Sequence, residues 1–430
     1  MNKKRITVLI GAGGAIEIGG PTTNDITQKI IKHRIDLIDY KSGILKNVYK
    51  IIEKYYQPDI ANFEHLMHIL EMLNTYGKIF EDPAPYRIAV YKPLLAPFIK
   101  PRYKRFFKGY KDISVQLAMR YLIDIIADEI DHYNEDFIKT ENTYNWYKDF
   151  WNKSNVNWDI TTLNYDMTIE HSLDENFEDG FEPIIYGREN NDKILHTTSL
   201  SLEELDNLAS RFNPSRLLQQ SKSVVNHLHG CIRFGYCWNE RNIYEDEIKG
   251  IVKFQNYHIA KKTWRSNSSK TQAAEDIVKG PIITGLRKTE KITAYPYSLY
   301  QYYLQNSIIS NSSLLIIGYS FGDLYLNEII GRVNRIHGDK KRIVIFTYYG
   351  KRYWSEDHSI NDFFDHDNAY MFYAKACTTS YPLEGHSEKE FFDKKPLRSK
   401  NGKVLIFLNG FKDAVENHKE LIFDFLLKND

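Results

Sequence analysis

The hydrophobic pattern begins with a short apolar run that predicts a buried strand. Residues 6–10 are rich in β-branched side chains and run directly into glycines, as in a parallel strand covered on both faces. Residues 11–21 then predict a loop, with Asn24 as the expected cap of the following helix. Similar apolar runs predict further strands at residues 158–162, 224–228, 281–284, 314–317, 342–347 and 404–408.

Helical periodicity dominates residues 43–150. Apolar side chains repeat at helical spacing in two stretches, so each stretch has one apolar face. These side chains are Phe63, Leu66, Met67, Leu70 and Leu73, and then Val115, Met119, Leu122, Ile126 and Ile130. Stripes of this kind indicate core packing. We therefore predict a large helical insertion at about residues 43–150.

Strands alternate with helices over the rest of the chain, with helices expected at residues 299–309 and 323–336 and after Gly410. This alternation predicts an α/β fold with a mostly parallel sheet and helices on both faces. We expect a core at residues 1–350, interrupted by the insertion, and a C-terminal βα extension at 351–430, whose place the pattern leaves open. Residues 175–222 and 236–278 are mostly polar and predict long loops or small excursions from the core.

Composition limits the class of partner. With 42% hydrophobic and 26% charged residues, the chain can bury a sizeable core. A net charge of +1 gives no whole-chain argument for nucleic acid or an anionic membrane. One local segment, Lys100 to Lys108, interleaves cations with aromatic rings, which suits nucleic acid, an acidic partner or simply a solvated loop.

Cysteine content and hydropathy indicate a reducing, cytoplasmic location. The three cysteines, Cys231, Cys237 and Cys377, cannot form a disulfide framework or a four-cysteine zinc ribbon. No apolar run approaches the roughly 20 residues of a membrane helix. The basic residues 3–5 before the first apolar run resemble an export signal, but that run is too short, so a buried strand is favoured over export.

A glycine-rich loop directly follows the first predicted strand. Gly11-Ala12-Gly13 stands between a strand and a helix, where backbone N–H groups can meet a phosphate. Tight turns also need glycine, so the loop alone is weak evidence. The third position of the dinucleotide fingerprint is Ile16 rather than Gly or Ala. This mismatch places ordinary dehydrogenases second.

Another pattern fits without a gap. Gly11-Ala12-Gly13 is followed after five residues by Gly19-Gly20-Pro21, which resembles the opening motif of the sirtuins. Further motifs follow in family order and resemble the Thr-x-Asn-x-Asp, His-Gly and Gly-Thr-Ser motifs of sirtuins and of sirtuin-like bacterial antiphage proteins. They are Thr162-Leu163-Asn164-Tyr165-Asp166, His227-Leu228-His229-Gly230, and Gly318-Tyr319-Ser320-Phe321-Gly322-Asp323 with Asn327.

This resemblance implies a Rossmann-like core and an enzyme that consumes NAD. It implies catalytic roles for Asn164 and His229. Contacts to NAD are implied for Gly11, Ala12, Gly13, Pro21, Thr22, Asp166, Gly318, Tyr319, Ser320 and Asn327. The role of Asp166 stays open between ordering the strand end and contacting a ribose.

The implied roles agree with the chemistry of the side chains. Cleavage of the nicotinamide–ribose bond passes through an oxocarbenium-like state, as glycoside hydrolysis does. Asn164 can orient a ribose hydroxyl or the attacking water, and His229 can accept a proton. Taken alone, the same residues predict a helix cap and an ordinary buried histidine.

Two departures from the deacylating sirtuins narrow the activity. Thr22, Thr23 and Asn24 stand where the deacylases have Asp-Phe-Arg, and their four-cysteine zinc module is missing. The resemblance therefore implies an NAD glycohydrolase that uses water as acceptor and depletes NAD in antiphage defence, by abortive infection. The alternatives are a catalytically silent subunit that binds NAD or ADP-ribose and, third, a deacylase. Family members imply a homo-oligomer and a defence partner such as a hexameric ATPase.

A metal site is a further alternative. Strand alternation can place His227, His229 and Cys231 on one face, with Cys237 nearby. The spacing matches no standard zinc finger. We therefore expect no metal.

Overall fold

The computed structural model describes most of the chain in fifteen ranges. These are residues 3–33, 44–55, 61–76, 111–173, 176–183, 209–218, 221–236, 251–264, 268–270, 276–278, 281–286, 288–293, 296–348, 396–399 and 402–428. Cys237, Cys377 and the segment 100–108 lie outside them. The expectations for these residues therefore stay predictions.

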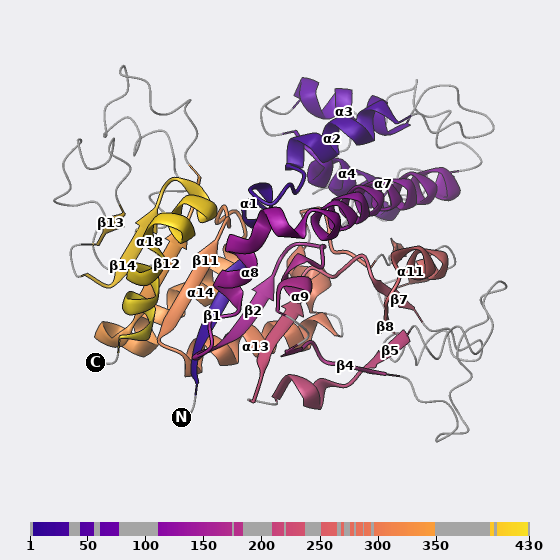
Figure 1. Cartoon of the computed structure of the whole chain (residues 1–430). Coiled ribbons are helices and arrows are strands. Elements are labelled where there is room, and N and C mark those ends of the chain that lie inside the picture. Colours follow the sequence, from indigo (N-terminus) through magenta and orange to yellow (C-terminus); the bar gives the residue numbers. More distant parts are fainter. Residues whose placement is uncertain are drawn as a thin grey trace, which may run out of the picture.

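The main sheet has eight strands in the order β13-β14-β12-β11-β1-β2-β6-β3 (Figure 1). All neighbouring pairs are parallel except β13 with β14. The strands are β1 Lys4–Ile10, β2 Val156–Thr162, β3 Phe177–Glu178, β6 Ser223–His227, β11 Ser313–Ile317, β12 Arg342–Phe346, β13 Leu397–Arg398 and β14 Val404–Phe407. The predicted mostly parallel sheet is confirmed. The C-terminal segment, whose place the sequence left open, adds β14 beside β12.

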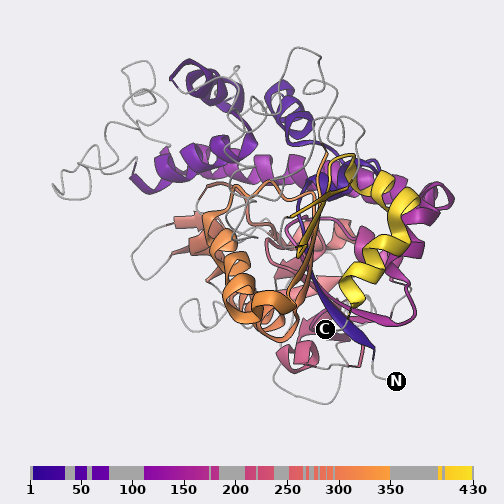
Figure 2. The same cartoon turned by 90° about the vertical axis from the view of Figure 1, so that its left-hand side faces the viewer.

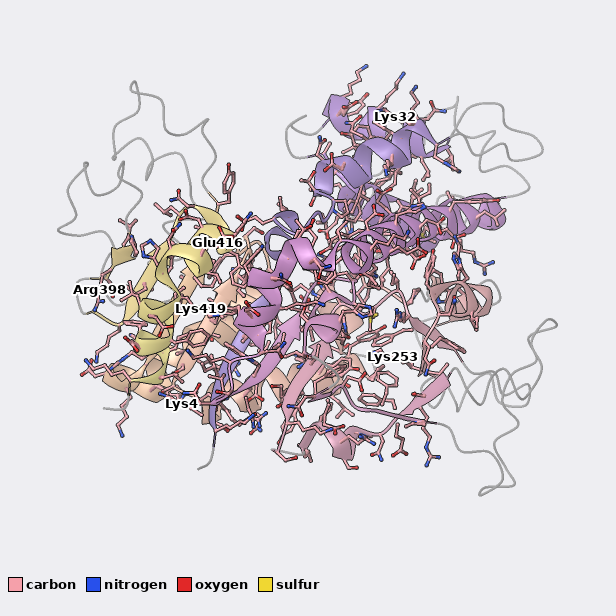
Figure 3. The ribbon with its side chains drawn as sticks, in the orientation of Figure 1. Lys4, Lys32, Lys253, Arg398, Glu416 and Lys419 are labelled. Atoms are coloured by element: carbon pink, nitrogen blue, oxygen red, sulfur yellow. The ribbon has the colours of Figure 1, made fainter. Side chains whose placement is uncertain are left out.

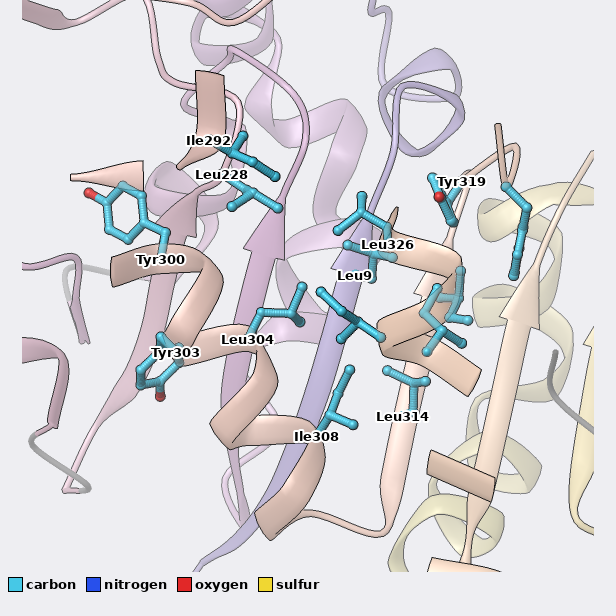
Figure 4. Packing of buried hydrophobic residues seen from close by; sticks show 14 of the residues in the cluster. Leu9, Leu228, Ile292, Tyr300, Tyr303, Leu304, Ile308, Leu314, Tyr319 and Leu326 are labelled. Carbon is cyan, nitrogen blue, oxygen red and sulfur yellow. The ribbon is translucent and has the colours of Figure 1, made fainter. Parts of the chain in front are cut away.

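Helices cover both faces of this sheet, as the sequence predicts. On one face, α13 (Tyr297–Ser310) and α14 (Leu324–His337) pack on β1 and β11 through an aliphatic and tyrosine core (Figure 4). On the other face, α8 (Asn145–Trp151) and α18 (Gly410–Leu427) bury an aromatic cluster against β2 and β12. Its rings are those of Phe150, Trp151, Trp158, Phe346, Phe411 and Phe423.

A second core is built mainly from helices in and next to the predicted helical insertion. Helices α2 (Thr23–Lys32), α3 (Ile44–Tyr55), α4 (Phe63–Tyr76) and α7 (Lys111–Lys139) pack together there. The predicted apolar stripes of α4 and α7 are buried in this core. Figures 1 and 2 show these helices at the end of the sheet toward which its parallel strands run. The insertion therefore stands over the carboxyl edge of the sheet.

A small antiparallel sheet occupies part of the region where the sequence predicts loops or small excursions. Its order is β4-β5-β8-β7. The strands are β4 Phe181–Pro183, β5 Ala209–Phe212, β7 Phe234–Tyr236 and β8 Ile251–Phe254, followed by α11 (Tyr257–Trp264) and the hairpin of β9 (Ser268–Lys270) and β10 (Asp276–Val278). Strands of three or four residues are too short for periodicity to detect.

The remaining elements are short helices. They are α1 (Gly13–Ile16), α9 (Thr168–Ser172), α12 (Lys288–Ile292) and the 3-10 helices η4 (Glu141–Tyr144), η5 (Pro214–Leu218) and η6 (Gly338–Lys340). Within the described ranges, no helix combines the length and apolarity needed to cross a membrane.

Two local predictions are wrong. The expected strand at residues 281–284 is a single bridge between Ile282 and Gly230, with no ladder on either side. The cap of α2 is Thr22 rather than Asn24, because the Thr22 hydroxyl accepts from the Asp25 N–H and the Asp25 carboxylate closes a capping box. The first error concerns a segment whose partner lies far away in the chain, whereas the second is a local competition between two cap residues.

Candidate functional site

Four neighbouring strands of the main sheet end at the same level. The register aligns Ile317 of β11 with Ile10 of β1, Ile10 with Thr162 of β2, and Thr162 with His227 of β6. The four predicted motifs begin at or directly after these residues. The fold therefore brings them together along one carboxyl edge, where open α/β sheets bind ligands.

The glycine loop after β1 packs directly against the loop after β11. The Gly11 N–H donates to the Ile317 carbonyl at 2.9 Å, and the Gly13 N–H donates to the Gly318 carbonyl at 2.9 Å. A Cβ on Gly11 or Gly13 would come within 2.7 or 2.8 Å of the Gly318 oxygen. These glycines are thus required for contact between two loops, and their amides bond the chain itself rather than a phosphate.

One amide of this loop remains available. Ala12 is exposed, and its N–H donates to no described residue. At the far end of the turn, Pro21 and Thr22 are half-buried, and the Thr22 side chain is engaged with Asp25. The capping role occupies the hydroxyl that the resemblance assigns to NAD.

The Gly-Tyr-Ser loop has an internally braced conformation. The Tyr319 hydroxyl lies 3.0 Å from both the Asp323 carbonyl and Asn327 Oδ1, and Asn327 Nδ2 donates to the Phe321 carbonyl at 2.7 Å. Phe321 has φ 56°, the one positive φ of a non-glycine residue in the described part of the chain. Backbone strain of this kind clusters at functional sites. The bracing leaves Ser320 exposed at the edge.

Asn164 has a fixed backbone and an available side chain. Its N–H donates to Thr162 Oγ1 at 3.0 Å, and its carbonyl lies 3.3 Å from His227 Nδ1. The side chain is half-exposed and bonds no described residue. An amide held in this way can offer a ligand both a donor and an acceptor.

Asp166 has a local role. Its Oδ1 accepts from the Thr168 N–H at 3.1 Å and from the Thr168 hydroxyl at 2.6 Å, at the start of α9. Burial raises the pKa of this carboxyl group, although the bonds from Thr168 oppose that shift. Of the two roles that the sequence left open, these contacts favour ordering the end of the strand.

His229 is buried, with 3% of its surface exposed. Its Nε2 is also buried and has no hydrogen-bond partner among the described residues. Burial, together with the positive charges of Lys288 and Lys291, holds the pKa of the imidazole well below its ordinary value. A neutral ring is therefore expected at neutral pH, with a nitrogen able to accept a proton.

This environment predicts the titration of His229. We expect an NMR titration of the ring to show no protonation between pH 8 and about 6.5, the ordinary histidine pKa. Lys291→Gln should raise the pKa of His229, because it removes one of the positive charges that lower it. Lys261→Gln, at a surface pair with Asp128, is the matched control. If His229 titrated near pH 6.5 in the parent protein, the prediction that its surroundings lower its pKa would be wrong.

Among the described residues, the alternative zinc ligands His227, His229 and Cys231 do not form a metal-binding group. His227 bonds Glu170 and faces the Asn164 carbonyl, while the Cys231 thiol donates to Met167 Sδ at 3.1 Å. Burial raises the pKa of this thiol to about 12, which disfavours the thiolate that zinc requires. In the described part of the chain, one group has metal-ligand spacing, formed by Asp131, Glu135 and His258 at the surface.

Sequence reasoning missed two charged residues behind Asn164. Glu170 on α9 lies 2.7 Å from His227 Nε2, and Lys253 on β8 lies 3.4 Å from the same Glu170 oxygen. Both are buried. Because they are 83 positions apart, no local pattern could have paired them.

One protein-family model matches the part of the chain that holds most of these residues. Residues 159–370 match the model of the SIR2-like domain. The chain carries a SIR2-like domain. The matched range includes Asn164, His229 and Gly318 and begins after the glycine loop. No curated protein matches the chain.

SIR2-like domains are, in general, NAD-dependent enzymes. The residues at the carboxyl edge of the sheet offer polar groups that suit a dinucleotide such as NAD. The Asn164 side-chain amide and His229 Nε2 have no partner among the described residues, and Ala12 and Ser320 are exposed in the loops that follow β1 and β11. The first pair suits a ribose, and the second pair offers donors to phosphate or hydroxyl oxygens.

Proposed function

We propose that the protein is an NAD glycohydrolase that releases nicotinamide and ADP-ribose. The observation that carries this proposal is that Asn164 offers an available side-chain amide, while His229 has a lowered pKa and an Nε2 without a partner among the described residues. They follow the ends of two adjacent strands. A protein that only binds NAD needs a nucleotide site but not both of these groups.

The chemistry divides between the two residues. Loss of nicotinamide leaves an oxocarbenium-like ribose that water attacks. Asn164 orients a ribose hydroxyl or the attacking water through its amide. His229 takes the proton from that oxygen, for which it must be neutral. The lowered pKa keeps the His229 ring neutral at cellular pH, although it also makes the ring a weaker base.

Water rather than acyl-lysine is the acceptor in this proposal. Thr22, Thr23 and Asn24 replace the Asp-Phe-Arg of the deacylases, and Thr22 here caps α2. The chain also lacks enough cysteines for the deacylase zinc module. Both differences remove parts associated with peptide handling.

The biological setting is proposed from the motif resemblance. We infer that NAD depletion serves antiphage defence by abortive infection in the cytoplasm. Uncontrolled depletion would kill the host, so a homo-oligomer or a defence partner such as an ATPase is expected to control it. The helical insertion stands over the carboxyl edge, which makes it the proposed contact surface for such control.

The test measures nicotinamide release by the full chain, with and without an acetyl-lysine peptide. A hydrolase releases nicotinamide and ADP-ribose in equal amounts, at a rate that the peptide leaves unchanged. Release that depends on the peptide would establish a deacylase instead. NAD binding without release, including in lysate from phage-infected cells, would favour the silent subunit.

A further inference from the structure

Four buried or half-buried ionisable side chains form a hydrogen-bonded network next to the backbone of Asn164. Lys253 on β8, which is labelled in Figure 3, donates to Asp179 Oδ2 at 2.6 Å and lies 3.4 Å from Glu170 Oε1. The same Glu170 oxygen lies 2.7 Å from His227 Nε2. Glu170 and His227 are 6% and 1% exposed, so water does not replace these bonds.

The electrostatics of this network favour the charged forms of Glu170 and Lys253. Burial opposes ionisation of Glu170, but His227 and Lys253 outweigh it and lower the pKa of the carboxyl group. Burial likewise opposes the charge on Lys253, yet Asp179 and Glu170 raise its pKa. Removing one member of a buried ion pair leaves the charge of the other uncompensated. Glu170 and Lys253 therefore hold each other in place.

At one end of this network, His227 contacts the backbone of Asn164. The His227 ring is oriented at Nε2 by Glu170, which directs Nδ1 at the Asn164 carbonyl, 3.3 Å away. On the other side, the Asn164 N–H is anchored to Thr162. The backbone of Asn164 is therefore held from both sides while its side chain stays available.

We propose that Glu170, acting through His227, is a positioning residue for Asn164, and that Lys253 and Asp179 hold Glu170 in turn. This inference rests on the proposed function. Groups that orient a reacting amide must fix it within about half an ångström, and a hydrogen bond to its carbonyl does so without consuming the side chain. Through Lys253 on β8, this network also connects the small sheet to the loop that carries Asn164.

The test compares Glu170→Gln with Glu178→Gln. Glu178 is buried and pairs with Arg216 at 2.8 Å, but it has no described contact with Asn164. We expect Glu170→Gln to lower kcat about tenfold or more while KM stays within about twofold. Glu178→Gln should lower the melting temperature similarly and leave kcat unchanged. Equal kcat values in the two variants would overturn the proposal.

A second readout does not need activity. In protein labelled with 15N-asparagine, the side-chain amide resonance of Asn164, assigned with Asn164→Ala, should move in Glu170→Gln and stay in Glu178→Gln. If the parent releases no nicotinamide, the proposed function fails, and this resonance still decides the positioning role. If Glu170→Gln does not fold, Asp179→Asn, which is isosteric and half-buried, replaces it. An unmoved Asn164 resonance in the folded variant would refute the role.

Discussion

Asn164→Ala is expected to reduce NAD hydrolysis by about 100-fold or more, the usual effect of removing an oriented polar group at a reacting centre. The side chain has no partner among the described residues, so its loss breaks no internal bond. Folding and NAD binding should therefore persist. The measurement is kcat from nicotinamide release, with NAD affinity from calorimetry.

Asn157→Ala is the matched control for this variant. Asn157 lies on β2, the strand that Asn164 follows, near the opposite end of that strand, and its side chain donates to the Ser221 carbonyl at 3.3 Å. It should cost stability and leave kcat unchanged. If Asn164→Ala turned over NAD at the parent rate, the active site would lie elsewhere.

Gly318→Ala is expected to destabilise the protein by about 3 kcal/mol or more. Gly318 has φ +57°, and a Cβ there would collide with the backbone of Gly13 and Gly14, reaching within 2.6 Å of the Gly13 Cα. Both loops would have to separate, so NAD affinity should fall as well. Urea unfolding and calorimetry measure the two effects.

Gly338→Ala separates the strain of a positive φ from the collision. Gly338 has φ +49°, and a Cβ there would meet nothing within 4 Å. Only the left-handed conformation is penalised, at about 1 kcal/mol. Similar losses of stability in the two variants would show that close contact between the two loops is not what requires glycine at 318.

The main sheet and its site edge were largely predictable from sequence. Strands such as β1 and β11 are short apolar runs buried on both faces, and their length, β-branched residues and flanking glycines identify them as strands. The order of motifs along the chain also placed Asn164 and His229 after β2 and β6. Parallel strands share one carboxyl edge, so this placement follows from topology alone.

What the sequence could not give depends on contacts between distant segments. The glycines at 11 and 13 suit a phosphate loop, but here they admit the backbone of Gly318, more than 300 positions away. The Glu170–Lys253 pair also joins separate segments. Neither contact leaves a local pattern, so only the fold reveals it.

The most direct test of the central claim is the crystal structure of the Asn164→Ala variant with intact NAD. We predict the nicotinamide ribose beside residue 164 and His229, at the ends of β2 and β6. The adenosine and phosphates should lie over Ala12 and Ser320, at the ends of β1 and β11. NAD bound away from this edge, or bound with the nicotinamide over β11, would contradict the account.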